Sequence, residues 1–548
     1  MRSIQGRGVS DGLAQGPLVF FRRAEVRPVQ TAGKEPAEER ARFLRAQAAC
    51  VRELEELAGM HTGEAALLLE THAMLAEDED FIACILACME RGDCAESAVQ
   101  QAGEQFAALF FNMDDPYMRE RAADVTDVAR RLLCILTGQE ERSFVLTAPA
   151  ILCADDLSPS ETLGLDRSFL LGFLTREGSK ASHTAILART LGIPAVCGLG
   201  ADLPEEDGLL CCLDGGEGTV VLDPDEAFLT RWAERTARQR EERARCEAVR
   251  GLEDVSPDGR RVDILCNIGT PADLPAVLDG DGRGIGLLRS EFLFLGRKTP
   301  PGEEEQLAAY KSVTAAMGDK PVVIRTMDLG ADKQAAFLPV EVEPNPALGL
   351  RGVRLCLERP ELFRTQLRAL YRASAFGNVS VMFPMIASAW EVRECRRVCG
   401  EVMDELEREG IPFRRETPLG IMIETPAAAL MAEELAWEAD FFCLGTNDLT
   451  QYVLACDRQA GHLDRYRDPR HPAVLRAVRM AAEGARAAGI PVSICGDLAG
   501  DAGLLSEFLA WGIGALSVPP ARVLPLRWAL RGLSQTSPHM TGKQEETI

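Results

Sequence analysis

The chain has 548 residues, of which 46% are hydrophobic and 26% charged, so it is expected to be globular with two or three domains. Its net charge of −24 disfavours nucleic acid and anionic membranes as partners, because both would repel it, whereas a basic protein would be attracted. Seventeen cysteines without a C-x2-C pair, and no long apolar segment or signal peptide, indicate reduced thiols in a cytoplasmic protein that does not insert into membranes.

The first half of the chain predicts an α/β domain with a helical domain inserted into it. A glycine-rich strand, turn and strand are expected between Ile4 and Phe21, and strand-like runs return after residue 145. Between them apolar residues recur at three- and four-residue spacing, which predicts helices. We therefore expect residues 1–30 and 145–225 to form the α/β domain and residues 33–140 the helical one.

The second half predicts a (β/α)8 TIM barrel over residues 256–533, after a charged linker helix at 226–255. Short apolar strands alternate there with helical stretches, and the final residues 534–548 are polar and expected to be disordered. The predicted barrel strands are 262–268, 284–288, 321–326, 379–385, 420–424, 441–445, 492–495 and 515–518.

The tripeptide Ser182-His183-Thr184 is a candidate phosphorylation site. It follows a small-residue turn and opens an apolar helical run. A helix start presents free N–H groups and the positive end of the helix dipole, so a phosphoryl group on His183 would be favoured there. A single histidine at a helix start is more often structural, and the tripeptide alone leaves both interpretations open.

Polar residues also follow the predicted barrel strands, where barrel enzymes carry their chemistry. Arg289 and Arg325 are suited to clamp a phosphate or carboxylate, although either could instead be a surface ion-pair partner. Glu424 and Asp448 follow successive strands and would suit Mg²⁺, unless each only caps a helix. Cys495 could transfer a proton or be a buried apolar residue.

The string from Gly178 to Val196 resembles the phosphohistidine signature of the phosphoenolpyruvate-utilising enzymes, and the barrel strings resemble the same family. The resemblance runs over nearly the whole chain. It implies a multidomain α/β protein: a swivelling phosphohistidine domain with an inserted helical domain, followed by a barrel that binds phosphoenolpyruvate and Mg²⁺. It also implies a homodimer through the barrel.

The resemblance assigns a role to each matching residue. It implies that His183 is phosphorylated, that Thr162 orients its imidazole and that Cys495 protonates the enolate carbon. The implied phosphoenolpyruvate ligands are Arg289, Arg325, Asn447, Asp448 and Arg458, and the implied Mg²⁺ ligands are Glu424 and Asp448.

Order and length favour the enzyme I group of this family, which passes the phosphoryl group to the histidine phosphocarrier HPr. No ATP-binding domain precedes His183, and the acidic segment 70–80 resembles a carrier-docking surface. Two alternatives stay open: a dikinase relative whose nucleotide-binding part is a separate chain, and a non-catalytic paralogue that binds the carrier. The family pattern is altered at Ser179, Ala181, Ala331 and Asp497, which leaves the assigned chemical groups in place.

Overall fold

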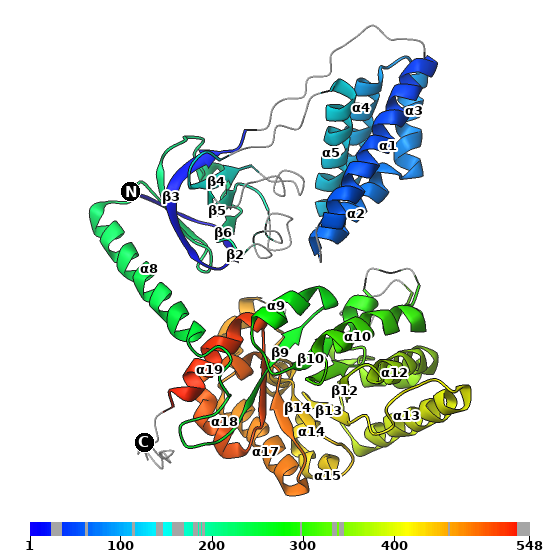
Figure 1. Cartoon of the computed structure of the whole chain (residues 1–548), viewed down its shortest axis with the longest axis vertical. Coiled ribbons are helices and arrows are strands. Elements are labelled where there is room, and N and C mark those ends of the chain that lie inside the picture. Colours follow the sequence, from blue (N-terminus) through cyan, green and yellow to red (C-terminus); the bar gives the residue numbers. More distant parts are fainter. Residues whose placement is uncertain are drawn as a thin grey trace. The chain divides into compact units, whose positions relative to one another are not determined.

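The structure is a computed structural model that divides into two compact units, residues 1–240 and 241–548 (Figure 1). It describes residues 1–22, 36–60, 64–111, 116–138, 146–155, 169–178, 185, 188, 192–295, 297, 299–330, 337–338, 345–458 and 461–533. His183, Thr162 and the expected disordered tail lie outside the described residues, as do Ser179, Ala181 and Ala331.

The first unit contains an eight-stranded sheet of order β1-β8-β7-β3-β4-β5-β6-β2. Its strands are β1 (Arg2–Gln5), β2 (Arg7–Ser10), β3 (Leu13–Phe20), β4 (Ala150–Ala154), β5 (Leu170–Thr175), β6 (Ala195–Cys197), β7 (Leu210–Asp214) and β8 (Thr219–Leu222). β3 pairs with β4 in parallel and with β7 in antiparallel orientation, so the N-terminal strands join those after residue 145, as expected. The N-terminal segment forms three strands instead of the predicted two, and β6 and β7 were not predicted.

Within the described residues between β3 and β4, five helices have a core of their own. They are α1 (Pro36–Met60), α2 (Glu64–Ala76), α3 (Glu79–Glu90), α4 (Ala95–Phe111) and α5 (Pro116–Thr137). The side chains of Phe43, Phe81 and Leu132 are fully buried in this core. The apolar spacing in the sequence therefore marked the buried faces of these helices correctly.

The charged stretch forms helix α8 (Glu226–Glu247), whose Trp232 packs on Cys212 and Val221 of the sheet. On the sheet, Ala185 and Ala188 from the run that follows His183 are helical and fully buried. The hydroxyl of Ser10 donates a hydrogen bond to the Ala188 carbonyl oxygen at 3.2 Å, which ties this run to β2.

The second unit is a closed barrel of eight parallel strands, and this confirms the predicted fold (Figure 1). The strands are β9 (Asp263–Ile268), β10 (Ile285–Arg289), β11 (Pro321–Arg325), β12 (Asn378–Phe383), β13 (Leu419–Ile423), β14 (Phe442–Leu444), β15 (Val492–Ile494) and β16 (Ala515–Val518). Pairing of β16 with β9 closes the barrel, with Ala515 opposite Asp263.

Helices surround the barrel strands and cover their outer faces (Figure 1). They are α9 (Leu274–Asp279), α10 (Glu303–Met317), α11 (Val353–Glu358), α12 (Pro360–Ser374), α13 (Ala389–Glu409), α14 (Pro426–Leu430), α15 (Ala432–Ala436), α16 (Thr446–Leu454), α17 (Pro472–Ala488), α18 (Leu505–Trp511) and α19 (Val523–Arg531). Because the strands are enclosed on both faces, they are nearly continuous apolar runs, as parallel strands require.

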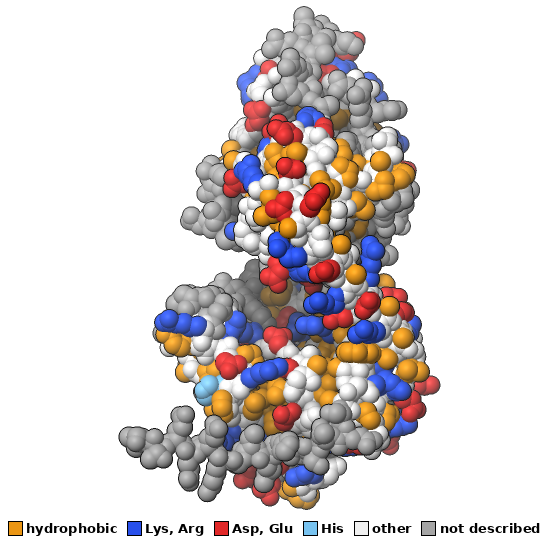
Figure 2. Space-filling model, turned by 90° about the vertical axis from the view of Figure 1, so that its left-hand side faces the viewer, with side chains coloured by type: hydrophobic (Ala, Val, Ile, Leu, Met, Phe, Trp, Pro, Cys, Tyr) orange, Lys and Arg blue, Asp and Glu red, His pale blue; other side chains and the backbone are white. Residues whose placement is uncertain are grey.

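None of the described helices is both long enough and apolar enough to cross a bilayer. On the face drawn in Figure 2, hydrophobic side chains are interspersed with basic and acidic ones. Many of the charged side chains pair with each other on the barrel helices, for example Arg368 of α12 with Glu303 of α10.

Candidate active site

Seven residues singled out in the sequence line one cavity of about 200 Å³ in the barrel unit. They are Arg289, Arg325, Glu424, Asn447, Asp448, Arg458 and Cys495. Arg289 and Arg325 are the last residues of β10 and β11, and Glu424 and Cys495 directly follow β13 and β15. The cavity therefore lies at the carboxyl ends of the strands, where a barrel places its catalytic groups.

Arg325 is buried between two carboxylates. Its Nη2 donates to Glu291 Oε1 at 2.8 Å, and its Nη1 lies 3.1 Å from Asp328 Oδ2. Burial by itself would lower the pKa of Arg325, but the nearby charges of Glu291 and Asp328 outweigh it and raise the pKa. The guanidinium group therefore stays charged and held in a defined position.

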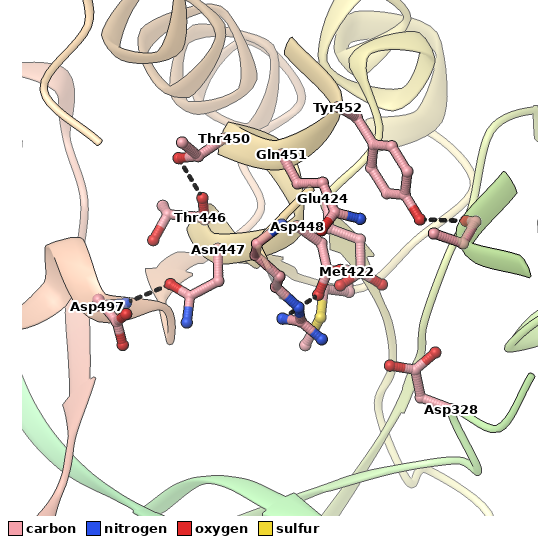
Figure 3. Close-up of polar contacts among 12 residues, drawn as sticks. Asp328, Met422, Glu424, Thr446, Asn447, Asp448, Thr450, Gln451, Tyr452 and Asp497 are labelled. Atoms are coloured by element: carbon pink, nitrogen blue, oxygen red, sulfur yellow. Dashed lines mark hydrogen bonds and ion pairs between the residues drawn. The ribbon is translucent and has the colours of Figure 1, made fainter. Parts of the chain in front are cut away.

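Asp448 is held by two further arginines. Its Oδ1 lies 3.2 Å from Nη1 of the buried Arg351, and its Oδ2 lies 3.1 Å from Nη1 of Arg458. Asp448 is in the first turn of α16, where the helix dipole favours a carboxylate. Next to it, Asn447 accepts a hydrogen bond from the backbone N–H of Asp497 at 2.7 Å, while its amide nitrogen faces the open space of the site (Figure 3).

Glu424 is the most deeply buried acid of the candidate metal pair, with 1% of its surface exposed. Its Oε1 accepts a hydrogen bond from the backbone N–H of Met385 at 2.6 Å. Burial raises the pKa of Glu424 well above its usual value, and the negative charges of Asp328 and Asp448 add to this, while Arg325 and Arg351 oppose it. An additional positive charge in the cavity would therefore favour the ionised carboxylate.

The arrangement of Glu424 and Asp448 fits a divalent cation. Both carboxylates face the same open space, with Asp328 across from them (Figure 3). A Cβ atom at Gly445 would come within 2.9 Å of Glu424 Oε2, so only glycine leaves room for that carboxylate. Among the described residues no three His, Cys, Asp or Glu side chains form a metal-binding group, so the other ligands would be water and bound substrate.

Arg289 differs from the other arginines of the cavity because it is exposed at the end of β10. Within the described part of the chain, no ion pair or hydrogen bond engages its guanidinium group. Its charge is therefore available to an anionic ligand, whereas those of Arg325 and Arg458 are shared with Glu291, Asp328 and Asp448.

Cys495 lines the cavity while being 97% buried, at 3% exposure. The neighbouring thiol of Cys443 and burial raise the pKa of Cys495, against the lowering effect of Arg325 and Arg289, and the Cys495 thiol donates a hydrogen bond to the Leu444 carbonyl oxygen at 3.7 Å. The thiol is thus protonated at neutral pH and could donate a proton into the cavity. The adjacent Gly496 is required because a Cβ atom there would lie 2.1 Å from Thr446 Oγ1.

Sequence reasoning missed three buried residues of this network, Glu291, Asp328 and Arg351. Glu291 and Asp328 come two and three residues after β10 and β11, so the strand-end pattern that identified their neighbours could have identified them. Arg351 precedes α11 and follows no strand, so only the folded barrel reveals its contact with Asp328 and Asp448.

The fold and the cavity define a class of protein, a (β/α)8 barrel with arginines and paired carboxylates around a cavity at the carboxyl ends of its strands. Three family models match the chain: "PEP-utilising enzyme, PEP-binding domain" at residues 243–535, "PEP-utilising enzyme, N-terminal" at 5–121 and "PEP-utilising enzyme, mobile domain" at 146–218. The chain belongs to the family of phosphoenolpyruvate-utilising enzymes, and the resemblance seen in the sequence is confirmed.

Proteins named phosphoenolpyruvate-protein phosphotransferase are similar over most of their length. That of Priestia megaterium is 37% identical, covering 98% of this chain and 96% of the relative. That of Staphylococcus carnosus is 38% identical, covering 86% of this chain and 83% of the relative. An NMR solution structure of Enzyme I is 31% identical, covers 43% of this chain and 99% of that one, and superimposes with a TM-score of 0.34.

Proposed function

We propose that this chain transfers the phosphoryl group of phosphoenolpyruvate to its own His183 and then to a histidine phosphocarrier of the HPr type. The observation that carries the proposal is the gathering of Arg289, Arg325 and Arg458 with Glu424 and Asp448 around one cavity. The relatives named phosphoenolpyruvate-protein phosphotransferase support the same reaction.

In the proposed reaction the arginines bind the substrate and disperse charge on the moving phosphoryl group. Arg289 takes the anion, because its charge is uncommitted, and Arg325 and Arg458 are already oriented by carboxylates. Asn447 offers its amide nitrogen to a substrate oxygen (Figure 3). We propose Mg²⁺ as the cation held by Glu424 and Asp448, where it supplies positive charge to the substrate oxygens.

In the proposed reaction, side chains of this chain accept the phosphoryl group and supply the proton. The bond between phosphorus and the enol oxygen breaks, and a bond forms between phosphorus and an imidazole nitrogen of His183, which Thr162 orients. Cys495 then gives its thiol proton to the terminal carbon of enolpyruvate, producing pyruvate. The position of Cys495 at the cavity wall supports this role.

We propose that residues 1–30 and 145–225 act as a swivelling phosphohistidine domain and residues 33–140 as the carrier-binding domain. One histidine cannot be at the barrel and at the carrier together, so the domain moves between them. Four consecutive acids, Glu77 to Asp80, are exposed from the end of α2 into the first turn of α3, and Met74 in the last turn of α2 is exposed too, which suits a basic carrier surface. Residues 226–255 link this half to the barrel of residues 256–533, and we further propose a homodimer through the barrel and a cytoplasmic location.

The proposal is tested by incubating the full chain with phosphoenolpyruvate labelled at phosphorus, Mg²⁺ and candidate carriers, followed by mapping of the label. We expect an acid-labile, alkali-stable label at His183 that passes to the carrier. Label entering from ATP or pyrophosphate would instead favour the dikinase alternative. A chain that binds the carrier but takes no label would favour the regulatory alternative.

A further inference from the structure

Four neighbouring strands of the barrel each direct one sulfur-containing side chain into its interior. They are Met382 of β12, Met422 of β13, Cys443 of β14 and Cys495 at the end of β15, and each is 3% exposed or less. With Leu287 they form one buried cluster, separate from the core between strands and helices. The proposed reaction uses only Cys495, so the other sulfur atoms have no assigned role.

The two thiols lie diagonally on adjacent strands. β14 pairs with β15 so that Cys443 is opposite Ser493, and Cys495 lies two residues further on the same face. The two thiols belong to one buried cluster, and that of Cys495 donates a hydrogen bond to the Leu444 carbonyl oxygen at 3.7 Å. A disulfide needs sulfur atoms about 2.0 Å apart and closely spaced Cα atoms, whereas thiolates on one metal ion stand roughly 4–5 Å apart, since each metal–sulfur bond is about 2.3 Å. The diagonal placement therefore suits an ion between the thiols better than a direct bond.

Two of the four sulfur-containing side chains border the substrate side, and Cys443 lies behind them in the same cluster. Cys495 lines both the 200 Å³ cavity and an adjoining cavity of about 670 Å³, and Met422 lines the smaller one. Thiolate and thioether ligands select soft ions such as Cu(I) over Mg²⁺. Two thiolates on a monovalent ion carry a net negative charge, which Arg289 and Arg325 at the same cavity would stabilise.

We propose that Cys443 and Cys495, with Met422 beside them, bind a soft monovalent cation of the Cu(I) class inside the barrel. Each thiol releases its proton to solvent and forms one sulfur–metal bond, with no change in oxidation state. Copper binding does not depend on the proposed function, but its effect on the reaction rests on that function. A Cys495 thiolate bound to the metal ion cannot protonate enolpyruvate. Pyruvate formation therefore stops, while phosphoryl exchange between His183 and the carrier continues.

The test titrates the full chain with Cu(I), buffered by a competing chromogenic chelator without air, and measures both copper bound and pyruvate formed. Cys443→Ser removes one thiol of the pair, and its inhibition is expressed relative to its own rate without copper, because Cys443 neighbours the proposed proton donor Cys495. Its half-inhibiting copper concentration should rise by more than about tenfold. The matched control is Cys395→Ser, a buried thiol of α13 in the outer core, which should leave inhibition unchanged.

Copper K-edge absorption should show only sulfur neighbours in the unaltered chain, and Cys443→Ser should bind one tight equivalent fewer. Equal copper binding by the two serine variants would overturn the site. Inhibition that requires air and is reversed by dithiothreitol would also overturn it, because it would indicate a disulfide. Copper bound at the pair without loss of pyruvate formation supports the site and removes Cys495 as proton donor. The binding measurement thus stands even if the chain does not turn over phosphoenolpyruvate.

Discussion

Arg351 holds Asp328 through two parallel hydrogen bonds, from Nε to Oδ1 and from Nη2 to Oδ2, both 2.9 Å long. Both side chains are 1% exposed or less, and the third guanidinium nitrogen of Arg351 reaches Asp448. Arg351 therefore connects the loop before α11 to Asp448, one of the two carboxylates of the candidate metal site. Arg351 thus places a buried positive charge beside the carboxylates of the cavity.

Arg351→Met should strongly destabilise the barrel, because it leaves Asp328 buried with an incompletely compensated charge. Breaking one partner of such a pair costs about 3–5 kcal/mol. Calorimetry of the full chain should show a lower barrel transition, with the other transitions unchanged. Arg393→Ala, which removes the exposed ion pair with Glu438, is the matched control and should cost less than about 1 kcal/mol. Equal shifts for both variants would contradict the role given to Arg351.

Arg289→Ala and Arg325→Ala should differ in stability but not in the direction of their effect on activity. Both should lower kcat/KM for phosphoenolpyruvate, and the decrease should correspond to a loss of about 3–5 kcal/mol of transition-state stabilisation. Only Arg325→Ala should also lower the Tm of the barrel, since Arg325 pairs with the buried Glu291 and Asp328 while Arg289 is exposed. Steady-state kinetics and calorimetry on the same preparations separate the two effects. Normal kcat/KM in Arg289→Ala would remove it from the substrate site.

The raised pKa of Glu424 predicts that the stability of the metal-free chain depends on pH. Its pKa is raised in the folded state by burial and by Asp328 and Asp448, so the folded chain keeps a proton that the unfolded chain has lost. The stabilising contribution of protonated Glu424 is complete at a pH below the ordinary pKa of glutamate. It is lost as the pH rises through the raised pKa of the folded state. The barrel Tm should therefore fall with rising pH.

Mg²⁺ should reduce this fall, because it stabilises the ionised carboxylate, and Glu424→Gln should abolish both the fall and the Mg²⁺ effect. Melting curves between acid and neutral pH, with and without Mg²⁺, provide the measurement. A Glu424→Gln barrel that still gains stability from Mg²⁺ would move the cation elsewhere in the cavity.

Cys495→Ala should slow the formation of pyruvate by about 10²–10⁴-fold, the usual contribution of a positioned acid. It should still accept a phosphoryl group from phosphorylated carrier at His183, because that transfer needs no proton at carbon. Exchange of the C3 protons of pyruvate, followed by NMR, should be lost. An unchanged exchange rate would make Cys495 a core residue of the barrel interior, in line with its deep burial.

His183→Ala should abolish labelling by phosphoenolpyruvate while leaving the barrel cavity able to bind it. All of the barrel ligands lie beyond residue 258, so binding should not require the histidine. Calorimetric titration with phosphoenolpyruvate and Mg²⁺ measures the binding, and acid-labile label measures the transfer. Label retained in the variant would place the nucleophile on another residue.

Much of this architecture could be predicted from local patterns. A barrel strand enclosed on both faces must be an apolar run, and its last residue must emerge at the carboxyl rim, so Arg289, Arg325 and Glu424 could be assigned to one site from their position after such runs. The three-residue β6 was missed, whereas the equally short β14 and β15 were predicted because they belong to the regular alternation of strands and helices in the barrel. His183 and Thr162 stay predictions, carried by their motif alone.

The partners of each charge depend on contacts between distant segments. Arg325 and Arg289 are each the last residue of neighbouring strands, yet one is buried between Glu291 and Asp328 and the other is exposed. Arg351 meets Asp448 across 97 residues, and Cys443 meets Cys495 because β14 and β15 are adjacent in the closed barrel. Residue type and strand period are local properties of a chain, whereas burial and charge pairing arise only when the strands close around a common interior.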